Sequence, residues 1–128
     1  SEPTAPVSVG LHEAGRVPAR NVTIHNTRAY VVYQRTGLIE IVDITSPSTP
    51  KLLGHYETTG QPEMVAADGT SIVIPKSGDG IEIVNLVDPT APTVTTTYDT
   101  PGTARDIAIH GDYLLVADGQ SIEVLRWR

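Results

Sequence analysis

One segment of the sequence recurs along the chain at a nearly constant spacing. Residues 37–50 read GLIEIVDITSPSTP, residues 80–92 read GIEIVNLVDPTAP, and residues 121–127 give a shorter copy, SIEVLRW. Successive copies lie about 42 residues apart, within the range of roughly 40–45 residues that is typical of four-stranded propeller blades. A repeat of this length predicts an array of similar units, each of which buries its apolar faces against the next.

The segments between the copies alternate between short strand-forming runs and turns. Pro47 and Pro50 lack the amide donor of a sheet ladder and end the third strand of the first repeat. The pattern predicts antiparallel strands in every repeat and no helix. The expected units are blade one at 19–57, blade two at 61–99, the first three strands of blade three at 104–128, and one outer strand at 1–12.

The middle strands of each repeat are apolar almost without interruption. Antiparallel sheets with one wet face alternate apolar and polar residues, so continuous apolar runs predict that both faces are covered. Stacked propeller blades provide such cover, whereas a β-sandwich, the alternative fold, would not require the repeat. The residues expected to be buried are Val31, Val32, Ile41, Val42, Val73, Ile83, Val84, Leu115 and Val116.

The composition of the chain argues against several kinds of binding partner and site. The chain has 128 residues, a formal net charge of −6 and no run of basic residues, which argues against a nucleic-acid or anionic-membrane surface. It has no cysteine, so disulfides and thiolate metal sites are excluded. No stretch reaches the ~18 apolar residues of a membrane span, and the polar start is unlike a signal peptide.

Two copies of the repeat carry a recognisable motif. Residues 39–43, IEIVD, and residues 81–85, IEIVN, are each followed by Pro-x-x-Pro. In these features the chain resembles the LVIVD-repeat propellers, found mostly in secreted or surface proteins of bacteria and archaea. The resemblance implies a propeller that serves as a binding or interaction scaffold, and it alone suggests an extracellular or cell-surface location. The fifth motif position is Asp43, Asn85 and then Arg126, so a ring of metal ligands does not carry over.

Each copy also places a glutamate between two apolar residues, at Glu40, Glu82 and Glu123. Symmetric carboxylates could form a cation ring. We expect structural pairing with an Arg, Lys or backbone donor of the next blade instead, because charges inside strands are rarely left without a partner.

The strongest ligand-binding candidates lie where the chain enters the innermost strands. Arg20, Arg105 and Glu63 occupy corresponding positions there, and Lys76 is expected on the same face. Two arginines near a channel mouth could hold a carboxylate or phosphate. The alternative is that these arginines pair with Asn21, Asp106 or the glutamates.

Metal binding and catalysis have weaker support. His25 and His110 end equivalent strands and are the weak candidates for metal ligands, although Ala67 interrupts that pattern. The sequence contains no G-x-S-x-G, H-E-x-x-H or P-loop motif.

We expect no enzyme and no cofactor. A ligand-binding module for an anion or carbohydrate is the alternative function, and a fragment of a larger propeller enzyme is the second alternative.

The two ends of the chain fit the repeat together. Residues 2–6, EPTAP, match residues 88–92, DPTAP, and a β-prone segment at 7–12 follows them, whereas the third repeat lacks its fourth strand. Three blades do not close a ring, because propellers need about 4–8. We therefore expect a homodimer of six blades, with a trimer or a piece of a longer array as alternatives. The predicted interface residues are Val7, Val9, Leu11, Ile122, Val124 and Trp127.

Overall fold

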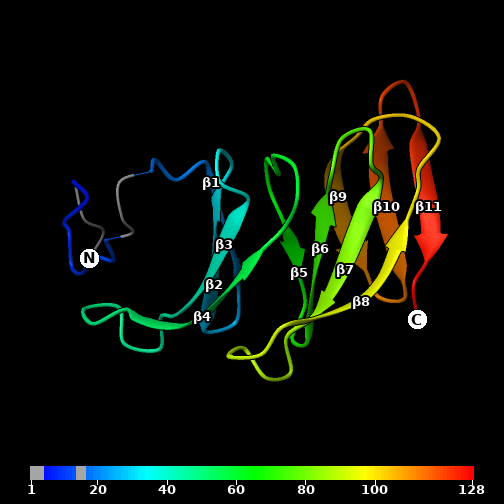
Figure 1. Ribbon diagram of the computed structural model, residues 1–128. Helices are drawn as coiled ribbons and strands as arrows, with labels where there is room; N and C mark the ends of the chain where they lie inside the picture. The colour runs from blue at the N-terminus through cyan, green and yellow to red at the C-terminus, as the bar shows by residue number, and fades with distance from the viewer. Residues whose placement is uncertain (1–4, 14–16) are drawn as a thin grey trace.

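The computed structural model describes residues 5–13 and 17–128. Within these residues the fold is all-β, with three antiparallel sheets side by side (Figure 1). Blade one contains β1 (Asn21–His25), β2 (Arg28–Tyr33), β3 (Leu38–Asp43) and β4 (Lys51–Glu57). Blade two contains β5 (Ala66–Ala67), β6 (Ser71–Pro75), β7 (Ile81–Asn85) and β8 (Thr93–Tyr98), and blade three contains β9 (Ala104–His110), β10 (Tyr113–Asp118) and β11 (Ile122–Arg126).

The strands of each blade pair in sequence order, as a meander. The third and fourth strands shift register at equivalent points, between Ile41 and Val42 in blade one and between Ile83 and Val84 in blade two. The repeat seen in the sequence is therefore also a repeat of register. The repeat predicts the first strand of blade two at 63–67, but β5 contains only the last two of these residues. Residues 63–65 stay outside it, and the Val65 carbonyl accepts a hydrogen bond of 2.7 Å from the Thr23 hydroxyl.

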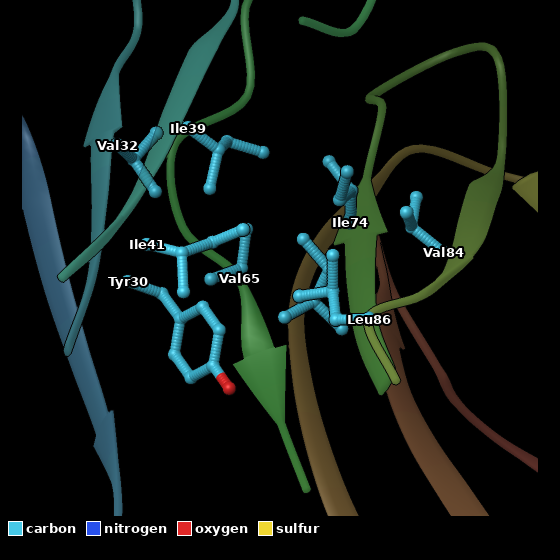
Figure 2. Close-up of a cluster of buried hydrophobic side chains, with 9 residues drawn as sticks. Tyr30, Val32, Ile39, Ile41, Val65, Ile74, Val84 and Leu86 are labelled. Atoms are coloured by element: carbon cyan, nitrogen blue, oxygen red, sulfur yellow. The ribbon is translucent and has the colours of Figure 1, made fainter. Parts of the chain in front are cut away.

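The core lies between neighbouring blades rather than inside a single sheet. Figure 2 shows the first cluster, in which Tyr30, Val32, Ile39 and Ile41 of blade one face the side chains of blade two. A second cluster joins blades two and three and includes Val73, Ile81, Ile83, Ala104, Ile107, Leu114 and Val116. Both faces of the middle sheet are thus covered, as the continuous apolar runs predict.

Two residues expected to be buried, Val31 and Leu115, are only half-buried. Val31 lies on the face of blade one that points away from blade two. Leu115 lies on the face of blade three that points away from blade two, with Ile122 and Val124, which are 69% and 61% exposed. The expectation is wrong for these two positions because no further blade stacks on either face within the described chain.

The expected outer strand at 7–12 forms no ladder within the single chain, and residues 1–4 lie outside the described residues. A strand assignment requires hydrogen bonds to a neighbour, and the neighbour predicted for this segment belongs to a second copy. In the described part of the chain, no helix has the length and hydropathy needed to cross a membrane.

Candidate functional site

The entrances of the three innermost strands meet at one pocket. β1, β5 and β9 contact one another in series, and the residues just before or at the start of each line an open cavity of about 400 Å³. Arg20, Glu63 and Arg105, three of the four predicted ligand-binding residues, lie around it together with Asn21, Met64 and Asp106. The repeat places these side chains together because they occupy the same position in successive blades.

The two arginines of this pocket are available to a ligand. Within the described residues, neither Arg20 nor Arg105 forms a side-chain hydrogen bond or ion pair, so the alternative pairing with Asn21 or Asp106 is not observed. The Asp106 carboxylate instead accepts a hydrogen bond of 2.9 Å from the Ile107 amide. Two guanidinium groups beside one pocket can bind a carboxylate or phosphate through paired hydrogen bonds.

Lys76, the fourth predicted residue, lies elsewhere. Its ammonium group is 3.6 Å from a carboxylate oxygen of Glu82 and donates a hydrogen bond of 2.7 Å to the Thr59 hydroxyl. It does not line the pocket of the two arginines. The hairpin between β6 and β7 holds Lys76 over its own blade, where it neutralises the repeated glutamate.

The two histidines are not gathered into one site. His25 lines a small pocket of about 110 Å³ with Arg28, Tyr30 and Gly69, and His110 is not among the residues that line it. No group of three or more His, Asp or Glu side chains converges in residues 5–13 and 17–128. Within the described residues, His25 and His110 are therefore not joined by other side chains that could complete a metal site.

The repeated glutamates are paired across blade boundaries, as expected, but their partners there are hydroxyl groups of the preceding blade and not a basic side chain or backbone donor of the next one. The Tyr56 hydroxyl of β4 donates a hydrogen bond of 2.8 Å to Glu82, and Thr58 donates one of 2.9 Å to the same oxygen. Tyr98 of β8 donates one of 3.0 Å to Glu123. Burial and the bond to Glu82 raise the pKa of Tyr56, and the bond to Glu123 raises that of Tyr98. Glu82 and Glu123 thus link their blades, through hydrogen bonds, to the outer strand of the preceding blade.

The comparisons with known proteins agree with this geometry. The LVIVD repeat family matches residues 18–58 and 101–124, which together make up more than half of the chain. The chain belongs to the LVIVD-repeat family. A search of curated protein sequences found no match.

Among solved structures, the LVIVD-repeat chain is similar to one titled "Crystal structure of the computationally designed Ika4 protein". The TM-score is 0.61 at 7% sequence identity, and the alignment covers 95% of this chain and 99% of that one. At this identity the likeness concerns the fold alone. It extends over nearly the whole of both chains.

The N-terminal segment of the LVIVD-repeat chain occupies a place that the repeat defines. A Cβ atom at Gly10 would lie 1.9 Å from the Pro47 carbonyl oxygen, and one at Gly54 of β4 would lie 2.0 Å from the Pro89 carbonyl oxygen. His12 lies 3.3 Å from Glu40, as Tyr56 contacts Glu82. Residues 5–12 therefore lie against blade one as β4 lies against blade two, in the position of an outer strand from a preceding blade.

The predicted interface residues are mostly exposed in the single chain. Val7, Val9 and Leu11 are 66–78% exposed, and Ile122 and Val124 are likewise open to solvent. Trp127 differs, because its indole N–H donates a hydrogen bond of 3.1 Å to the Gly111 carbonyl and its ring packs against the second core cluster. Trp127 therefore stabilises its own blade. The close approach at Gly10 and Gly54 was not recognised in the sequence, although the matching glycines 44 residues apart would have indicated it.

Proposed function

We propose that this LVIVD-repeat chain is a non-catalytic scaffold in which two copies assemble into a six-bladed ring and present a common surface for protein interaction. The observation that carries the assembly is the position of residues 5–12. They lie against blade one as an outer strand lies against the following blade, and none of the three sheets among the described residues includes them. β11 pairs only with β10 among the described strands, so its other edge can accept this strand.

The repeat gives the register of the proposed pairing. β3 pairs Asp43 with Lys51 and Ile39 with Tyr56, and β7 pairs Asn85 with Thr93 and Ile81 with Tyr98. The same offsets predict the partners Val7 with Arg126, Ser8 with Leu125, Gly10 with Val124, Leu11 with Glu123, and His12 with Ile122. Val9 falls at the bulge that both complete blades contain.

Apolar surface supports the same assembly. The outward face of blade three carries Leu115, Ile122 and Val124, and the outward face of blade one carries Val22 and Ile24, which are 58% and 61% exposed. Inside the chain, the corresponding faces of neighbouring blades form the two core clusters. Stacking blade three of one copy on blade one of the other would bury these residues in the same way, at two symmetric seams.

A cysteine cross-link tests the proposed register, since the chain has no cysteine of its own. The double variant Val7→Cys, Arg126→Cys is expected to form a covalent dimer on oxidation, visible on a non-reducing gel. Directly paired strand residues lie about 4.5–5.5 Å apart, which a disulfide can bridge.

The matched control is Val7→Cys, Ile122→Cys, in which the second cysteine is four residues out of register. It is expected to form little covalent dimer under the same oxidation. A double variant at positions 7 and 126 that oxidises only within one chain, or not at all while folded, would refute the swapped strand.

Anion binding at the arginine pocket is a second candidate function, favoured by the free guanidinium groups of Arg20 and Arg105. Inorganic phosphate and glucuronate are the probes. Either should raise the melting temperature of the wild-type protein, because a ligand that binds only the folded state stabilises it. The double variant Arg20→Ala, Arg105→Ala should lose the shift, whereas Arg35→Ala, an exposed turn variant, should keep it. An unchanged melting temperature at millimolar probe would remove this function.

A further inference from the structure

A buried cluster of oxygen atoms lies where β8 meets blade three, apart from the arginine pocket. Its carboxylates are Asp118, at the end of β10, and Glu123, on β11. Tyr98 donates a hydrogen bond to Glu123, and the Gly102 amide donates one of 2.8 Å to Asp118. Thr100 follows Tyr98 as Thr58 follows Tyr56 in the blade-two cluster, and Asp118 and Thr100 are only 5% and 4% exposed.

Three buried oxygen atoms of Thr100 and the two carboxylates have no hydrogen-bond partner in the part of the chain that the structure describes. They are Thr100 Oγ1, Asp118 Oδ1 and Glu123 Oε2. A buried oxygen without a donor is destabilising, and two carboxylates on the same face of a sheet also repel each other. The two carboxylates are therefore short of neighbouring positive charge.

The equivalent position in blade two supplies that charge. β6 pairs Ile74 with Glu82, and Lys76, two residues further on, reaches the Glu82 carboxylate. β10 pairs Val116 with Glu123 in the same way, and the residue two positions further on is Asp118. An ammonium group in blade two is thus replaced by a carboxylate in blade three, while the tyrosine and the threonine of the cluster are retained.

We propose that this cluster binds a hard metal cation, with Asp118, Glu123 and Thr100 as its protein ligands. Ca²⁺ binds oxygen ligands, among them carboxylates, and water would complete its coordination. The proposed dimer brings no base to the cluster, because Leu11 is the residue expected opposite Glu123.

Calcium titration tests the site on the intact chain, by calorimetry and by melting temperature in CaCl₂ and in EDTA. Saturating Ca²⁺ should raise the melting temperature of the wild-type protein by roughly 5–10 °C. Asp118→Asn should weaken calcium binding at least about tenfold, and Thr100→Val should weaken it less. Asp112→Asn removes the same charge from an exposed turn of blade three and should bind as the wild type does.

Asp118→Lys is the decisive variant, because it copies Lys76 into blade three. In EDTA it should melt at or above the temperature of the calcium-loaded wild type, and added Ca²⁺ should have no effect on it. This variant also keeps the test valid if Asp118→Asn does not fold. Absence of calcium binding by the wild type, or equal binding by Asp118→Asn, would overturn the proposal. A wild type that is stabilised by mild acid but not by Ca²⁺ would also overturn it, since a shared proton would then be the occupant.

Discussion

A chain that lacks residues 1–12 is expected to lose the dimer and to aggregate or unfold. Deletion would leave the outer edge of β11 unpaired at both seams of the proposed ring and would remove His12 from Glu40. It would also leave the exposed apolar residues of blade three, Ile122 and Val124 among them, without cover. Size-exclusion chromatography and circular dichroism measure the two effects separately.

A milder variant keeps residues 1–12 but disturbs how they pack against blade one. Gly10→Ala puts a methyl group where the Pro47 carbonyl approaches to 1.9 Å, so it should weaken the dimer. Gly78→Ala places its methyl group in open space and should leave assembly unchanged. If the protein without residues 1–12 stays a folded dimer of unchanged stability, the swapped strand is not what closes the ring.

Replacing Ile83 with alanine is expected to lower the free energy of unfolding by about 2–5 kcal/mol, through lost burial and the cavity left behind. Ile83 is 8% exposed and belongs to the cluster that joins blades two and three. Chemical denaturation of both proteins measures the difference.

Val94→Ala is the matched control, because Val94 lies on the outer strand β8 and is 49% exposed. It should cost less than about 1 kcal/mol. A loss below about 1 kcal/mol for Ile83→Ala would show that this position does not lie between packed blades.

The repeat predicted the architecture well because its information is local. The spacing of the glutamate-centred copies and the prolines after them predicted sheet type and strand order, and also that Glu82 and Glu123 are paired, although not that their partners are tyrosines of the preceding blade. Burial at Val31 and Leu115 was predicted incorrectly, because it depends on neighbours that the single chain does not provide. An apolar pattern shows that a sheet face is suited to burial, whereas actual burial also depends on whether another blade stacks against that face.

The candidate sites were predicted less completely than the fold. Arg20, Glu63 and Arg105 were identified because equivalent positions of a repeat converge around its axis. Lys76 does not line that pocket, since the direction of its side chain depends on its ion pair with Glu82. The cluster at Asp118 was missed because it is visible only when the ends of β2, β6 and β10 are compared, where Tyr33, Lys76 and Asp118 occupy one position. The signal in the sequence is that a carboxylate replaces the lysine at this position of the repeat.

The central claim is that two copies of this chain complete one ring, and the mass in solution tests it most directly. Light scattering at several protein concentrations should give twice the chain mass of 13.7 kDa, with no species of three chains. A stable, folded species with the mass of one chain at every concentration would contradict the account.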